Sequence, residues 1–411
     1  MQRLISRVVL MSLLLSVTTA QADWTQFRGS QARSVSGSDT KVPLEWDTSA
    51  QRNVAWRADL VGRGPSGPIV VDNRVYVTSS SGYKQDRLHV LCYDATNGKQ
   101  LWHRQFWATG RTMTHPSSAN AAPTPASDGE SIYAFYSSND LICLDLDGNL
   151  RWYRGLAYDF PKAGNDVGMA SSPAVADGVV VVQVENQGDS FAAGIDTKTG
   201  KTLWQFERSK RANWSSPVIA KLPAGQALAL FKSGSGLDAH DLHTGERRWQ
   251  FAGDAGGISS VAVLDDKVIL PFNGLVSLDI TKPSQTPEVV WTSNRVNPGS
   301  ASPVVSDEHV YAINGAGVLV CADLKSGEVL WQVRLQGKFW ATPVLVDDHL
   351  FCINESGLAQ VVKVGDKGEI VAKNEFGETI QGSPAVDGGA LFVRSDQSLW
   401  KIAQVKDVDS P

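Results

Sequence analysis

The chain has 411 residues, of which 42% are hydrophobic and 20% are charged. This composition excludes a polytopic membrane protein and a disordered chain. The 38 Lys and Arg residues and 43 Asp and Glu residues give a net charge of −5, so no basic excess indicates a nucleic-acid partner. The 37 glycines, 18 prolines and 13 tryptophans, beside only 4 methionines, are typical of short strands joined by tight turns.

Residues 1–22 have the features of a cleaved signal peptide. Two arginines precede an apolar run at residues 8–17, which is too short to span a bilayer, and Ala20-Gln21-Ala22 fits a cleavage site. We expect a mature chain from about Asp23 that is periplasmic or secreted and does not span the membrane; an uncleaved anchor is the alternative. The first cysteine is Cys92, so the lipoprotein cysteine is missing from the cleavage region.

Two short motifs repeat along the rest of the chain. The first is an Asp, a turn that ends in Gly, and a Trp four residues after the Gly; it occurs at Asp94–Trp102, Asp145–Trp152, Asp196–Trp204, Asp241–Trp249 and Asp323–Trp331. Asp279–Trp291 is a stretched copy without the Gly, and residues 365–371 are a degraded copy without the Trp. The second motif is a small residue before a proline, found at Pro68, Pro125, Pro173, Pro217, Pro303, Pro343 and Pro384, with Val261 in the same slot.

The spacing of these motifs predicts the fold. Each unit of about 42 residues contains four strand-like runs, which is the pattern of a β-propeller blade. A solenoid is the alternative, but its ends would need caps that the sequence does not show. We predict an all-β, eight-bladed propeller of four-stranded blades over residues 53–404, with a tail at 405–411. The last unit lacks its fourth strand, and residues 53–58 resemble one, so the N-terminal strand should close the ring. Residues 23–52 should form a clasp outside the ring.

The four cysteines, Cys92, Cys143, Cys321 and Cys352, lie in apolar, strand-like runs. The first three are each followed two residues later by the Asp of a repeat, in a slot that other repeats fill with small residues. Equivalent slots on separate blades are usually too far apart for a disulfide, and a thiol packs as a small apolar group. We therefore expect buried free thiols.

The D-x-x-T-G-x-x-x-W unit, spaced by about 42 residues and preceded by Ser-Pro, resembles the pyrroloquinoline-quinone-like (PQQ-like) repeat over residues 54–404. The segments DWTQFRGS, HPSSANAAPTPASDG and GNDVGMASSP also resemble exported propellers of planctomycete type. The resemblance implies one of two functions: quinoprotein alcohol dehydrogenases hold PQQ and calcium on the propeller axis, whereas the propeller lipoprotein of the outer-membrane β-barrel assembly machinery is a non-catalytic scaffold. The chain has no adjacent cysteines and no recognisable calcium set, so PQQ stays a cofactor without a supporting motif.

Most of the tryptophans are expected to be structural. One Trp per blade at a fixed slot should pack between neighbouring blades; these residues are Trp56, Trp102, Trp152, Trp204, Trp249, Trp291 and Trp331. Trp214 and Trp340 instead precede first strands, where loops converge on one end of the channel. They are candidates for stacking a planar ligand, with simple packing as the alternative.

The same loops carry polar candidates for an axial funnel: Arg63, Arg111, His115, Asn165, Asp166, Arg211 and Lys338. Gathered at one mouth, they would form a mainly cationic pocket for a small anion or a carboxylate-bearing peptide; a solvated loop surface is the alternative. We expect no metal site and no catalytic residue, because Asp145-Leu-Asp147 and His240/His243 occupy turns and no hydrolase motif is present.

The sequence thus predicts an exported, non-catalytic and monomeric propeller that binds a protein, peptide or ligand as a scaffold in the cell envelope. A PQQ-binding oxidoreductase and a carbohydrate- or small-molecule-binding propeller are the alternatives.

Overall fold

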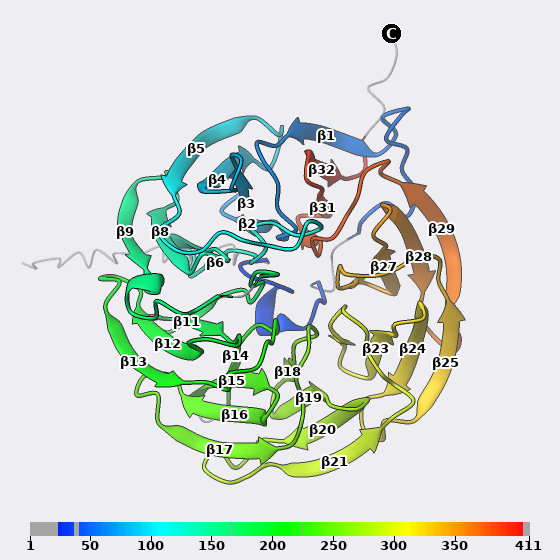
Figure 1. The fold of residues 1–411 in the computed structure, drawn as a ribbon. Helices are drawn as coiled ribbons and strands as arrows, with labels where there is room; N and C mark the ends of the chain where they lie inside the picture. The colour runs from blue at the N-terminus through cyan, green and yellow to red at the C-terminus, as the bar shows by residue number, and fades with distance from the viewer. Residues whose placement is uncertain (1–23, 37–40, 165, 224, 406–411) are drawn as a thin grey trace, which may run out of the picture.

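The computed structural model describes residues 24–36, 41–164, 166–223 and 225–405. Its strands form eight four-stranded antiparallel sheets arranged as a ring around a central channel (Figure 1). The predicted eight-bladed all-β propeller is therefore confirmed. The first strand of every blade begins one residue after the predicted proline or valine slot, because a residue without a backbone donor is tolerated just before a strand but not inside one. The predicted signal peptide and Asn165 lie outside the described residues.

In blades 1 to 7 the strands follow one another in chain order from the channel outward. Blades 1 to 3 consist of β2(Ile69–Val71), β3(Arg74–Ser81), β4(Arg87–Asp94), β5(Gln100–Trp107); β6(Ala126–Ser127), β7(Ser131–Phe135), β8(Asp140–Asp145), β9(Leu150–Gly155); and β10(Ala174–Ala176), β11(Val179–Val184), β12(Phe191–Asp196), β13(Thr202–Glu207). Blades 4 to 6 consist of β14(Val218–Lys221), β15(Ala227–Ser233), β16(Gly236–Asp241), β17(Arg247–Ala252); β18(Ala262–Leu264), β19(Lys267–Pro271), β20(Leu275–Asp279), β21(Glu288–Ser293); and β22(Val304–Val305), β23(His309–Ile313), β24(Val318–Asp323), β25(Val329–Arg334). Blade 7 consists of β26(Val344–Val346), β27(His349–Ile353), β28(Leu358–Lys363) and β29(Glu369–Glu375), and blade 8 of β30(Ala385–Asp387), β31(Ala390–Arg394), β32(Ser398–Ile402) and β1(Val54–Asp59). Two short 3-10 helices are η1(Ser30–Ala32) and η2(Leu156–Tyr158).

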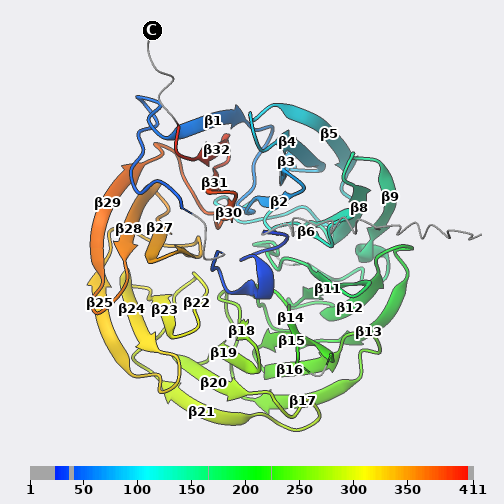
Figure 2. The ribbon, with the colours of Figure 1, turned by 180° about the vertical axis from the view of Figure 1, so that it is seen from behind.

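Blade 8 joins the two ends of the propeller. Strand β1 pairs antiparallel with β32, with Arg57 opposite Trp400 and Asp59 opposite Ser398. Both ring views show β1 as the outermost strand beside β32 (Figures 1 and 2). The predicted closure by the N-terminal strand is confirmed, and it covers a sheet edge that would otherwise be open.

The repeated tryptophans connect each blade to the next. The indole N–H donates to a backbone carbonyl of the following blade, at 2.8–3.0 Å, from Trp56, Trp102, Trp152, Trp204, Trp291 and Trp331. All seven predicted tryptophans are buried except Trp102, which is half-buried. The Trp249 indole N–H has no hydrogen-bond partner among the described residues, and the blade that follows carries the stretched motif without the Gly.

The small residue before each repeat Asp lies directly across the sheet from the repeat Trp. Cys92 pairs with Trp102, Gly194 with Trp204 and Cys321 with Trp331. A Cβ atom at Gly194 would lie 2.2 Å from Trp204 Cε2, so the indole ring leaves no space for a side chain in that slot of blade 3. The four cysteines are buried and free, as predicted, and burial raises the pKa of Cys92 to about 12. Their role is packing.

The N-terminal segment departs from the expected clasp. Residues 24–36 lie inside the channel (dark blue in Figures 1 and 2), where Trp24, Thr25 and Ser34 bond to the backbone beside first strands of blades 1, 2 and 7. The expectation that this part lies outside the ring is wrong, because apolar and backbone groups there find partners only on the innermost strands. Residues 41–53 do run along the outside of the ring, where the backbone N–H of Trp46 donates to Asn374 Oδ1 on blade 7 at 3.0 Å.

Candidate functional site

The channel holds a cavity of about 550 Å³, within the size range of ligand sites. Its wall is built from the residues that precede the first strands of the blades. Phe27 also lines it; this residue belongs to residues 24–36, the channel segment. All eight blades contribute, because the same loop of each repeat faces the axis. The cavity is thus the axial funnel that the loop positions predicted.

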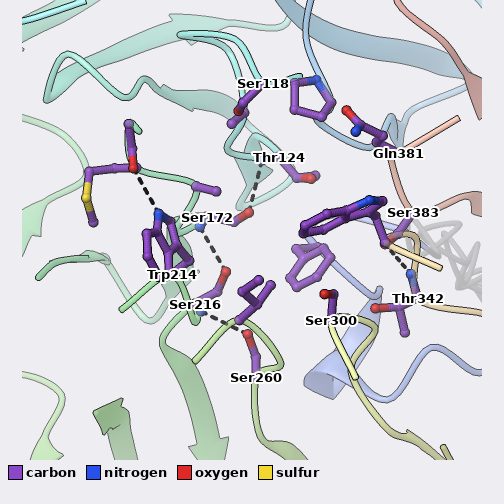
Figure 3. A pocket seen from close by; sticks show the side chains of 18 of the residues that line it. Ser118, Thr124, Ser172, Trp214, Ser216, Ser260, Ser300, Thr342, Gln381 and Ser383 are labelled. Carbon is purple, nitrogen blue, oxygen red and sulfur yellow. Dashed lines mark hydrogen bonds between the residues drawn. The ribbon is translucent and has the colours of Figure 1, made fainter. Parts of the chain in front are cut away.

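Seven hydroxyl groups form a ring in this wall, and Figure 3 labels all of them except Ser302. Each hydroxyl oxygen accepts a hydrogen bond, at 2.8–3.1 Å, from the backbone N–H of the residue that holds the same repeat position in the preceding blade. The acceptors in ring order are Thr124, Ser172, Ser216, Ser260, Ser302, Thr342 and Ser383. Each of these residues stands immediately before a proline or valine slot, so the repeat itself generates the ring.

The ring is open at one position, between blades 8 and 1. Gly67 occupies the eighth slot and only donates, from its N–H to Thr124 Oγ1 at 2.8 Å. A Cβ atom at Gly67 would lie 2.5 Å from the carbonyl oxygen of Ser383. The close approach of the two blades therefore excludes any side chain there.

The ring hydroxyls accept hydrogen bonds but donate none to the described residues. A hydroxyl carries one proton that rotates to suit a partner. Because all seven line the cavity, the wall offers a circle of uncharged donors to whatever enters. Carbonyl, ether and hydroxyl oxygens are the matching acceptors.

Trp214, Trp340 and His115 are the predicted site residues that line the cavity. The Trp214 N–H donates to the Gly168 carbonyl at 2.9 Å, which fixes its ring in the wall (Figure 3). Trp340 is 41% exposed. His115 Nδ1 lies 2.8 Å from Ser117 Oγ in a local turn. The structure brings these three residues together at one funnel, as their loop positions suggested.

The other predicted polar residues that the structure describes stand outside the cavity wall. Arg63 pairs with Asp396 and Arg211 with Asp254, at 2.9 and 2.8 Å, and Arg111 pairs with Asp166. Lys338 is exposed, and none of these side chains lines the cavity. Each of these three arginines, the rim arginines, pairs with an acid on a neighbouring loop, so its charge is compensated outside the cavity wall. Among the described lining residues, His115 is the only titratable one.

The residues present do not fit PQQ. The cofactor carries three carboxylates, and the described cavity wall offers neither lysine nor arginine. The four cysteines are distributed over separate blades, so no Cys-Cys element borders the cavity. In the part of the chain that the structure describes, no three His, Cys, Asp or Glu residues gather as a metal site.

Two parts of this site were missed from the sequence: the hydroxyl ring and the channel segment with Phe27. The first had a signal, because the small residue before the slot is Ser or Thr in seven of eight repeats. The second had none, since residues 24–36 belong to no repeat.

Comparison with solved structures places this ring among known propellers. BamB from Moraxella catarrhalis is 17% identical with a TM-score of 0.64, over 87% of this chain and 99% of that one. Quinohemoprotein alcohol dehydrogenase from Comamonas testosteroni is 12% identical with a TM-score of 0.69, over 95% and 82%. The computationally designed Ika8 protein is 11% identical with a TM-score of 0.61, over 84% and 98%. At these identities the likeness is one of fold.

No curated protein matches the sequence significantly. No helix among the described residues has the length and apolar character needed to cross a membrane. The family model described as outer membrane protein assembly factor BamB matches residues 21–167, 162–271 and 273–365, most of the chain. The chain therefore belongs to this BamB-like family of PQQ-repeat β-propellers.

Proposed function

We propose that this protein is an exported, non-catalytic binding propeller whose axial cavity receives an uncharged peptide segment of a partner protein in the cell envelope. The observation that carries the proposal is the ring of seven hydroxyl donors in a wall that also contains Trp214 and Trp340. Peptide carbonyls accept such donors, and tryptophan faces cover apolar side chains.

The charge of the cavity wall selects the ligand class. The rim arginines are paired with acids and do not line the cavity, so a carboxylate would enter without a fixed counter-charge. Burying an unpaired anion costs several kcal/mol. This favours an uncharged segment over the small anion that the loop composition first suggested.

The same wall supports binding without catalysis. His115 is the one titratable group among its described residues, and its Nδ1 accepts a hydrogen bond from the Ser117 backbone N–H at 3.2 Å. The neutral ring therefore carries its proton on Nε2, so the basic nitrogen is already engaged in the turn and is not free to take a proton from a ligand. The family description supports a protein partner, since it names outer-membrane protein assembly.

A neutral carbohydrate is the second candidate. Sugar rings stack on tryptophan, and their hydroxyls pair with hydroxyl groups of a protein. Trp214, Trp340 and the hydroxyl ring meet both needs in one cavity.

Site-specific photocrosslinking in the native envelope tests the proposal. A benzoylphenylalanine at position 340 stands in the cavity, whereas one at position 107, where Trp107 is 59% exposed on blade 1, is the matched control outside it. We expect a discrete protein adduct from position 340, lost in the Trp214→Ala background, and none from position 107. Adducts from position 107 alone, or partner recovery unaffected by Trp214→Ala and Trp340→Ala, would overturn it. A glycan adduct in place of a protein would select the second candidate.

A further inference from the structure

Arg28 is a buried cation inside the propeller. It lies on the channel segment and is 1% exposed. Its Nη2 donates to the Val261 carbonyl at the start of blade 5, while Nε and Nη1 have no hydrogen-bond partner among the described residues. Buried polar groups are nearly always paired, so two orphaned guanidinium donors require an explanation.

A small second cavity adjoins this side chain. It measures about 10 Å³, which is the space that one small particle of about the size of a water molecule needs. Arg28 lines it together with Ser172 and Ser216 of the hydroxyl ring. Phe27 lines both cavities, so the small cavity lies beside the axial one. The Arg28 guanidinium carbon is 5.2 Å from the Phe27 ring centroid.

No acid among the described residues compensates the charge of Arg28. Burial lowers its pKa to about 9, so it remains protonated at neutral pH. Arg394, the other fully buried arginine, likewise has two donors, Nε and Nη2, without a partner among the described residues, but an acid acts on its charge. Its Nη1 donates to Ser66 Oγ at 2.9 Å, and the nearby Asp396 charge raises its pKa against the effect of burial. Arg28 thus has a charge to neutralise, open donors, and a cavity to hold a counter-ion.

We infer that the cavity beside Arg28 is a binding site for one monatomic anion, such as chloride, held by Arg28 Nε and Nη1. The Ser172 and Ser216 hydroxyls, whose protons bond no described residue, are available as further donors. The anion neutralises the buried charge and ties the channel segment to blades 3, 4 and 5. Arg28 alone supplies the charge and two donors, so the site does not require the ligand proposed for the axial cavity, although Ser172 and Ser216 line both cavities.

Halide-dependent stability is the first test, using sodium chloride against sodium gluconate at about 200 mM each, so that ionic strength is equal. We expect the melting temperature of the mature chain to be about 2 °C or more higher in chloride, with saturation as chloride rises. Arg28→Met should abolish the difference. Arg33→Met is the matched control on the same segment, because Arg33 pairs with the exposed Asp307 at 3.3 Å, and it should keep the difference.

Crystals of the unaltered protein soaked in sodium bromide give the second test, which does not depend on whether a variant folds. An anomalous bromide peak within hydrogen-bond distance of Arg28 Nε or Nη1 is the expected result. A water molecule without anomalous signal at that place, or equal stability of the mature chain in chloride and gluconate, would overturn the inference. Loss of partner crosslinking with halide binding intact would overturn only the proposed function.

Discussion

The indole ring of Trp204 rests on Gly245 of the next blade. A Cβ atom at Gly245 would lie 2.6 Å from Trp204 Cγ, and the glycine has a φ of 70°. Glycine is therefore required at this position for two reasons: the backbone is left-handed, and the indole ring occupies the space of a side chain. The Trp204 N–H then reaches the carbonyl of Leu242, at 2.8 Å, in that same turn. One repeat motif thus supplies both halves of a contact between neighbouring blades.

Substitution of two tryptophans by phenylalanine separates packing from hydrogen bonding. Trp204→Phe leaves the buried Leu242 carbonyl unpaired, whereas the Trp249 N–H has no partner to lose. We expect Trp204→Phe to lower the free energy of unfolding by about 1 kcal/mol more than Trp249→Phe. Urea denaturation measures both. Equal losses would show that the indole hydrogen bond contributes nothing between blades. Trp204→Ala should cost about 3–5 kcal/mol, since it also leaves a cavity.

Two deletions distinguish closing the ring from filling the channel. Removal of residues 23–60 takes away β1, which exposes the edge of β32, and should cause aggregation or a large loss of stability. Removal of residues 24–36 alone leaves β1 paired and opens the channel, so the protein should stay monomeric with a smaller loss. Size-exclusion chromatography with light scattering reads the first effect, and urea denaturation the second. A monomeric, equally stable protein without residues 23–60 would refute closure by β1.

The sequence predicted most of the fold because the repeat encodes local needs. The Asp-to-Gly turn, the Trp and the small slot opposite it recur, so their period reveals the blades, and the orphan strand around Trp56 reveals the closure. The path of residues 24–36 could not be read, since their partners lie on separate blades and no motif links them. Likewise, Arg63 and Arg211 were visible as cations, but their acid partners, Asp396 and Asp254, come from distant positions in the chain.

Removing one hydroxyl from the ring and adding the missing eighth hydroxyl should both destabilise the propeller. Ser260→Ala removes the acceptor for the Ser216 N–H, now at 2.9 Å, and should cost about 1–2 kcal/mol. Gly67→Ser would supply the missing eighth hydroxyl, but its Cβ would collide with the Ser383 carbonyl. We expect this addition to destabilise the propeller as well. Thermal denaturation checks both variants. A gain in stability from Gly67→Ser would show that blades 8 and 1 separate more easily than the structure indicates.

A pair of histidines in blade 1 predicts how stability depends on pH. His89 is 1% exposed; its Nε2 lies 2.7 Å from Ser81 Oγ, and its Nδ1 lies 2.9 Å from His103 Nε2. Burial, with the His103 and Arg87 charges, lowers the pKa of His89 to about 4. The unfolded chain therefore binds a proton near pH 6.5 that the folded chain accepts only near pH 4. The contribution of a neutral His89 to the free energy of unfolding is fully present above pH 6.5. It is lost as the pH falls from 6.5 towards 4, which lowers the free energy of unfolding by up to about 3 kcal/mol.

Between pH 7 and 5 the carboxylates whose pKa values are lowered in the folded chain stay ionised, so they add little to the slope. Burial also lowers the pKa of His103 and of His240, which adds to the same slope, whereas burial raises the pKa of Glu185, which acts in the opposite sense. His89→Gln keeps a polar side chain beside Ser81 but cannot take up the proton, so it should flatten the dependence on pH. Urea midpoints at several pH values measure the slope for both proteins. An unchanged slope in His89→Gln would show that protonation of His89 does not limit the stability of the propeller in acid.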